Sequence, residues 1–149
     1  MGESPRGGGS NRPADLRPRV LVSNLQDAPV DAEGLAALAA HTLEGEGRRN
    51  VELSLSFVTP AQIEELHVRY LDEPGPTDVL SFPMDEEDLL GDVIVCPEVA
   101  AKSNADVEAE LRLLVVHGVL HLVGYDHEDD ADRAAMWAKQ EAYSGVRTP

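Results

Sequence analysis

Three of the five histidines fall within one short segment, HGVLHLVGYDH, which begins at position 117. On a helix that turns by about 100° per residue, His117 and His121 lie about 40° apart and one turn above each other, so both imidazoles can reach one ion. Gly124 can adopt the left-handed conformation that ends a helix, which lets the chain double back and bring His127 to the same ion. The spacing therefore predicts a metal site with three histidine ligands.

The ligand set predicts a catalytic zinc ion. Three neutral imidazoles favour Zn²⁺ over Mg²⁺ or Ca²⁺. A structural zinc site is closed by four protein ligands and usually recruits cysteine, whereas a catalytic site keeps one position open. The only cysteine, Cys96, is remote from the cluster in sequence. We therefore predict one catalytic Zn²⁺ per chain. His41 and His67 lack such neighbours and are predicted to have no metal role.

The ligand spacing H-x-x-x-H-x-x-G-x-x-H is also that of metzincin peptidases. Those enzymes place a glutamate directly after the first histidine as the general base, whereas this sequence has Gly118 there. A peptidase without that base lacks the group that deprotonates zinc-bound water. The ligand geometry is therefore predicted to be shared and the reaction class to differ.

The elements that must position these residues follow from hydrophobic periodicity and from capping signals. Period-two alternation is clearest between Val51 and Phe57, and caps are expected at Asp31 and Thr59. The predicted strands cover residues 19–24, 51–57, 79–82 and 92–95. The predicted helices run from the Asp31 cap to near Gly45 or Gly47, from Thr59 to about Leu71, from Asn104 or Asp106 to about Gly124, and from Asp129 or Asp130 to about Tyr143. This order predicts a single α+β domain in which helices pack on a mixed sheet of about four strands.

The longest predicted helix starts at Asn104 or Asp106 and carries the first two histidines. It is apolar around much of its circumference, which is typical of a buried central helix, and Gly124 is placed to stop it. The final helix is predicted to direct Met136 and Trp137 toward the body of the domain.

Length and composition fit one soluble domain. The 149 residues include 42% hydrophobic residues, which is enough for a core. Residues 1–17 are rich in Gly, Ser, Pro and Arg without periodicity, so we expect a flexible tail followed by a domain over 18–149. The net charge of −16 opposes nucleic-acid binding over long distances, although a bound dication and a few arginines can make one cleft locally positive.

The sequence also predicts a compartment. A lone cysteine forms no intramolecular disulfide, and no apolar N-terminal run precedes a cleavage site. No stretch approaches the roughly 18 apolar residues that span a bilayer. We expect a cytoplasmic protein without membrane attachment.

Three motifs resemble the bacterial YbeY family. HGVLHLVGYDH is similar to the family's histidine motif, the segment Pro76–Pro83 resembles its PTDVLSF block, and Leu90–Val95 resembles its LGDI strand. The resemblance implies an α+β fold with three zinc-binding histidines and a single-strand-specific, metal-dependent endoribonuclease. It also implies action on ribosomal RNA, in processing of the small-subunit rRNA 3′ end and in ribosome quality control, with no DNA substrate and a monomer or weak oligomer.

One position departs from the family pattern. Members often have Tyr-Arg at the end of the helix before the PTDVLSF block, with the arginine facing the cleft, whereas here Tyr70 is followed by Leu71. Arg69 is the nearest candidate to stabilise developing negative charge during catalysis, and a surface role remains the alternative. Arg112, five positions before the first ligand, is predicted to be a solvated helix charge.

No general base is evident in the sequence. Asp126 adjoins a ligand and Asp92 is predicted to end an acidic loop, so both are expected to orient imidazoles rather than to react. Thr77, Asp78 and Ser81 are expected either to cap a strand or to shape the cleft.

Two other functions remain open from the sequence. One is a zinc hydrolase of another bond class, such as a peptidase or amidase, which would need a base where Gly118 stands. The other is a non-catalytic ribosome-assembly factor that uses zinc for folding, since the free energy of metal binding can stabilise a fold.

Overall fold

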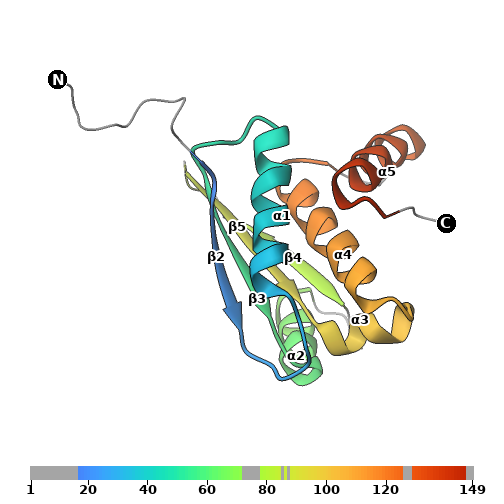
Figure 1. The fold of residues 1–149 in the computed structure, drawn as a ribbon. Coiled ribbons are helices and arrows are strands. Elements are labelled where there is room, and N and C mark those ends of the chain that lie inside the picture. Colours follow the sequence, from blue (N-terminus) through green and yellow to red (C-terminus); the bar gives the residue numbers. More distant parts are fainter. Residues whose placement is uncertain (1–16, 72–77, 85, 87, 126–128, 147–149) are drawn as a thin grey trace.

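The computed structural model describes residues 17–71, 78–84, 86, 88–125 and 129–146. These residues form one α+β domain (Figure 1). In chain order the elements are β2 (Arg19–Asn24), α1 (Ala32–Gly45), β3 (Glu52–Phe57), α2 (Pro60–Leu71), β4 (Val79–Pro83), β5 (Leu89–Val95), α3 (Pro97–Ser103), α4 (Val107–Leu122) and α5 (Asp130–Ser144).

The sheet has four strands in the order β2-β3-β5-β4. Strands β2, β3 and β5 run parallel, and β4 pairs with β5 in the antiparallel direction. At the centre of the sheet Leu55 lies between Val22 on one side and Val93 on the other. The predicted mixed sheet of four strands is therefore confirmed.

Helices α1 and α4 cover one face of the sheet, and α2 lies on the other (Figure 1). Successive strand residues point to opposite faces, so Val93 and Val95 join the core under α1 and α4 while Ile94 joins the cluster that includes Ile63 of α2. Fully burying a side chain of this size stabilises a fold by about 1.5–3 kcal/mol. This two-sided burial fixes the register of β5.

Helix α5 packs on the side of α4 that the sheet leaves open (Figure 1). Val116 and Leu120 of α4 form a buried cluster with Met136 of α5. Because α4 is covered by the sheet on one side and by α5 on another, its apolar residues surround it, as predicted for a central helix.

The prediction for α5 is confirmed for one residue and wrong for another. Met136 is fully buried, but Trp137 is 42% exposed. The two residues are about 100° apart around the helix, so one turns inward and the other outward. The Arg133 guanidinium lies 6.0 Å from the Trp137 ring, which gives the exposed indole a cationic neighbour.

The helix starts follow the predicted caps. Asp31 accepts a hydrogen bond from the Gly34 amide at 3.1 Å, and Asp106 and Asp129 cap α4 and α5 in the same way. Thr59 and Gln62 bond reciprocally, at 3.0 and 3.2 Å, in the capping box at the start of α2.

Two elements differ from the prediction. Strand β5 begins at Leu89 rather than at Asp92, because its first residues already pair with Glu52 of β3. Helix α3 was not predicted. Its seven residues carry too short a pattern for periodicity to reveal, and Pro97 at its first turn was the one local signal.

Most of the predicted flexible tail lies outside the described residues. Arg17, at its end, forms an ion pair with Glu44 of α1 at 3.5 Å. Within the described part of the chain, no helix has the length and apolar character that crossing a bilayer requires.

Candidate metal centre

The last two turns of α4 bring His117 and His121 together as predicted. Their ring centroids are 6.3 Å apart and their ring planes differ by 7°. The parallel rings result from the four-residue spacing, which stacks side chains on one face of a helix. The two imidazoles are therefore presented side by side at the carboxyl end of α4.

Each imidazole ring makes a hydrogen bond through its Nδ1 atom. His117 Nδ1 lies 2.8 Å from Gln140 Oε1 of α5, and His121 Nδ1 lies 3.2 Å from the Tyr125 carbonyl oxygen. Each acceptor requires an N–H at Nδ1, so the neutral ring carries its lone pair on Nε2. Metal-binding histidines commonly donate one ring N–H to an oxygen while the other nitrogen ligates. The two residues fit a site that uses Nε2.

Gln140 is an unusual residue to find in a core, since its side chain is only 3% exposed. Burying an amide is unfavourable unless it is hydrogen-bonded, and here it accepts from His117. Sequence reasoning missed this residue. Its place on the inner face of α5, four positions after Met136, was the available signal.

The turn after α4 supplies the acceptor for the second histidine. Gly124 has φ +112°, a conformation that favours glycine, and the Tyr125 amide donates to the Leu120 carbonyl at 3.0 Å. The chain therefore turns back at Gly124 as predicted, and this turn sets the Tyr125 carbonyl above His121.

The third predicted ligand, His127, lies outside the described residues, as does Asp126. Among the residues that are described, no group of three His, Cys, Asp or Glu side chains lies close enough to hold a metal ion. The described pair offers two nitrogen donors of the kind that zinc prefers.

Gly118 has a structural role that the sequence did not reveal. It is buried against the sheet, and a Cβ atom there would lie 2.7 Å from Val93 Cγ1 and 3.3 Å from Ser81 Oγ. Ser81 Oγ also donates to the Gly118 carbonyl at 3.4 Å. Position 118 therefore faces the sheet, and glycine lets α4 approach β4 and β5 closely.

Arg69 is in the last turn of α2, on the helix that covers the opposite sheet face from α4. Its side chain is 57% exposed and forms an ion pair with Glu65 at 3.3 Å, one turn earlier. Exposed pairs of this kind contribute about 0.3–0.5 kcal/mol, so Glu65 is a weak restraint on the guanidinium.

Two polar residues have different surroundings from those predicted. Asp92 lies within β5, paired with Phe82 and Ser54, and so does not end the acidic loop, because the strand begins three residues earlier. Arg112 is half-buried, and its guanidinium donates to the Ser144 carbonyl at the end of α5. It ties two helices together instead of being a solvated charge.

Of the three polar residues predicted to cap a strand or to shape the cleft, two lie within the described residues. Ser81 contacts α4, as a residue that shapes this region would, whereas Thr77 lies outside the described residues. Asp78 accepts a hydrogen bond from the Cys96 amide through its backbone carbonyl at 3.0 Å.

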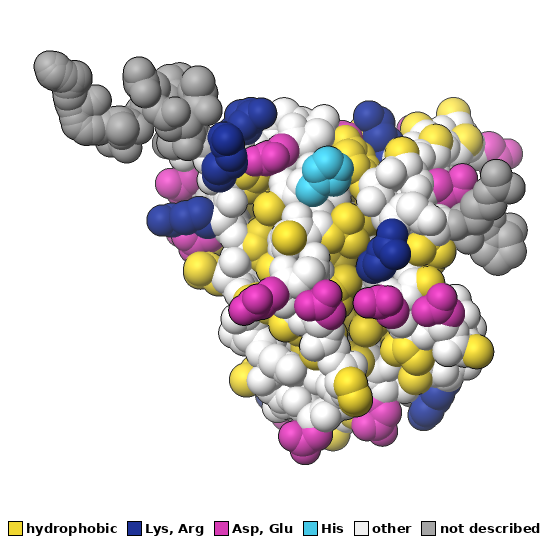
Figure 2. All heavy atoms as spheres, viewed as in Figure 1, with side chains coloured by type: hydrophobic (Ala, Val, Ile, Leu, Met, Phe, Trp, Pro, Cys, Tyr) yellow, Lys and Arg dark blue, Asp and Glu magenta, His cyan; other side chains and the backbone are white. Residues whose placement is uncertain are grey.

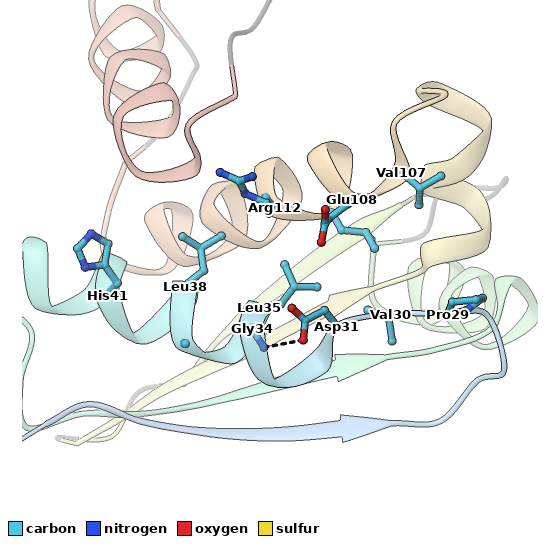
Figure 3. A pocket seen from close by; sticks show the side chains of 12 residues that line it. Pro29, Val30, Asp31, Gly34, Leu35, Leu38, His41, Val107, Glu108 and Arg112 are labelled. Carbon is cyan, nitrogen blue, oxygen red and sulfur yellow. Dashed lines mark hydrogen bonds between the residues drawn. The ribbon is translucent and has the colours of Figure 1, made fainter.

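An apolar cavity lies away from the histidine pair. It has a volume of about 700 Å³ and opens between the first halves of α1 and α4 (Figure 3). Leu35, Leu38 and Leu111 line it, and Arg112 and His41 lie at one end. Figure 2 shows apolar side chains along this face with acidic side chains in a row across it. Neither His117 nor His121 lines the cavity, which belongs to a different part of the surface.

The family model described as "Endoribonuclease YbeY" matches residues 21–145. The chain belongs to the YbeY family. The match includes every residue predicted to act in catalysis or metal binding, so the resemblance seen in the three motifs is confirmed.

Curated relatives and a solved structure agree with the YbeY assignment. The chain is 41% identical over 143 residues to an endoribonuclease YbeY of Streptomyces coelicolor, covering 81% of this chain and 85% of that one. It is 46% identical over 139 residues to that of Mycolicibacterium gilvum, covering 81% and 78%. The solution structure of TM1509 from Thermotoga maritima is similar with a TM-score of 0.57 and 33% identity, covering 84% and 86% of the two chains.

Proposed function

We propose that this YbeY protein is a zinc-dependent, single-strand-specific endoribonuclease that acts on ribosomal RNA, in small-subunit 3′ end maturation and in ribosome quality control. The observation that carries the proposal is the endoribonuclease YbeY match over residues 21–145, with two of its histidines already aligned on α4. We place the enzyme in the cytoplasm, as a monomer or weak oligomer, with its catalytic domain in residues 18–149.

His117, His121 and His127 would hold one Zn²⁺ in this proposal. When bound, the ion supplies Lewis acidity toward a phosphate oxygen and lowers the pKa of water. The contacts at Nδ1 support this part of the proposal, because they leave Nε2 of His117 and of His121 to face the ion.

Arg69 is our candidate for the residue that stabilises negative charge on the scissile phosphate. A guanidinium always carries its charge and matches two phosphate oxygens with paired N–H groups. The last turn of α2 precedes β4, the strand through which Ser81 contacts α4, and the Arg69 side chain is exposed.

The peptidase alternative finds no support in the curated relatives, which are named as endoribonucleases. Position 118 adds a physical argument against it. A glutamate there would have to enter the packed interface between α4 and Val93, where even one methyl group is crowded.

The decisive assay compares substrates. Protein loaded with zinc is offered single-stranded RNA, duplex RNA and casein, beside a His117→Ala variant. We expect cleavage of single-stranded RNA alone and its loss in the variant. Casein cleavage that depends on His117 would favour the peptidase, and zinc binding without any cleavage would favour an assembly factor.

A further inference from the structure

The carboxylate of Glu46, at the end of α1, contacts three donor side chains from distant parts of the chain. Glu46 follows the last residue of α1, and its side chain is 10% exposed. It accepts hydrogen bonds from Tyr125 Oη at 2.8 Å and from Tyr143 Oη at 2.6 Å, and its ion pair with Lys139 Nζ measures 3.3 Å. Hydrogen bonds to an ionised acceptor are about twice as strong as neutral ones.

The packing around the carboxylate is specific. Tyr143 lies so close to Gly45 that a Cβ atom at that position would overlap its phenol group. Glycine at position 45 is thus what lets the ring reach Glu46. The backbone of Glu46 is itself fixed, since its amide donates to the Thr42 carbonyl at 3.1 Å.

Protonation states agree with this geometry. Hydrogen bonds from Tyr143, Tyr125 and Lys139 outweigh the effect of burial and lower the pKa of Glu46, so the carboxylate stays charged. Burial and the bond to Glu46 raise the pKa of Tyr143 to about 12, so its phenol remains a donor near neutral pH.

One partner of Glu46 also supports a metal-site imidazole, and another adjoins the residue that supports the second. The carbonyl of Tyr125 accepts from His121, and Gln140, which accepts from His117, directly follows Lys139 on α5. One carboxylate on α1 therefore holds both the turn and the helix that orient the rings.

We propose that Glu46 is a positioning residue for the imidazoles of His117 and His121, acting through Tyr125 on one and through α5 on the other. The part of this inference that concerns zinc rests on the proposed function. The part that concerns the rings stands on the metal-free protein alone.

The first test reads the rings directly. Histidine tautomers in metal-free protein are assigned by ¹H–¹⁵N NMR at a pH where the imidazoles are neutral. In the wild type we expect the Nδ1–H form for His117 and His121. In Glu46→Ala we expect mixed tautomers at both, with Glu46→Gln intermediate because one acceptor oxygen remains. Unchanged tautomers in a folded Glu46→Ala protein would overturn the proposal.

The second test measures zinc affinity by competition with a chromophoric chelator. Loss of a residue that supports a metal ligand by hydrogen bonding typically weakens metal binding 10–100-fold, and we expect a loss of about tenfold for Glu46→Ala. Tyr125→Phe with Tyr143→Phe should weaken binding similarly. Adding Glu46→Ala to that pair should change little, because the pair already removes the two hydrogen bonds to the carboxylate and leaves only its ion pair with Lys139 to lose.

Asp31→Ala is the matched control. It removes the cap at the other end of α1, which destabilises the fold, and touches neither histidine support. We expect it to leave the tautomers and the zinc affinity unchanged. An equal loss of affinity in Asp31→Ala and Glu46→Ala would show that Glu46 only stabilises the fold, and would overturn the proposal.

The two tests separate this inference from the proposed function. A wild type that binds no zinc would defeat the proposed metal chemistry, while the tautomer result would still decide the role of Glu46. If Glu46→Ala binds zinc as tightly as the wild type does, the metal centre stands and the positioning role of Glu46 is overturned.

Discussion

Gly118→Ala should destabilise the protein even though it replaces glycine in the middle of a helix. Such a change usually stabilises a helix by about 1 kcal/mol, because glycine has the larger conformational entropy to lose. The structure predicts the opposite sign, since the added methyl group points into the interface between α4 and the sheet.

The magnitude follows from two distances. The new Cβ would lie 2.7 Å from Val93 Cγ1 and 3.2 Å from Val93 Cγ2, whereas carbon atoms pack at about 3.5–4.0 Å. Val93 is fully buried within β5 and has little room to move. Overpacking of this kind costs about 1–3 kcal/mol, so the net loss expected after the helix gain is about 1 kcal/mol.

The assay is urea unfolding of metal-free protein in a double-mutant cycle with Val93→Ala. That second change removes both crowding methyl groups and alone should cost about 2 kcal/mol. The two changes should compensate, with a coupling of about 1–2 kcal/mol. A stabilised Gly118→Ala protein, or losses that simply add, would refute the reasoning and place position 118 on an open surface.

Four further predictions concern the site and its supports. Gln140→Ala should weaken zinc binding by about 10–100-fold in a chelator competition, because His117 loses its acceptor; full affinity would remove Gln140 from the site. Zinc affinity should fall below about pH 6 as the imidazoles protonate, and a flat profile from pH 5 to 8 would contradict histidine ligation. Arg69→Ala should slow RNA cleavage by roughly ten- to a thousandfold with zinc content unchanged, and equal rates would reassign the role. Because the pKa of Tyr143 is raised, the contribution of its phenol to stability is fully present below about pH 10 and is lost as the pH rises through about 12. The difference in unfolding free energy between the wild type and Tyr143→Phe should therefore shrink over that range.

Much of the fold was predictable because its signals are local. The caps at Asp31, Asp106 and Asp129 and the alternation of β3 are read from neighbouring residues, and they located the elements to within a few residues. The start of β5 was misplaced because pairing with Glu52 of β3, and not its own sequence, extends the strand to Leu89.

The site was predictable only in part. The histidine spacing on α4 is a helical pattern and is visible in the sequence, as is the turn at Gly124. The residues that support the histidines were not visible in the sequence. Gln140 and His117 are 23 residues apart, and no periodic pattern indicates a contact between them. The role of Gly118 was not visible either. A glycine in the sequence shows that the general base of a peptidase is missing, but it does not show that the helix approaches the sheet closely at that position.

The antiparallel edge strand β4 also has a dynamic consequence. It pairs with β5 alone over five residues, the last of which, Pro83, has no amide hydrogen to donate. Strands held on one side open at a lower free energy than the interior of a sheet. In native-state hydrogen exchange, the amides of β4 should therefore lose protection before those of β3. Such an opening would break the contact between Ser81 and Gly118 and expose the inner side of α4 to solvent while the rest of the core stays folded.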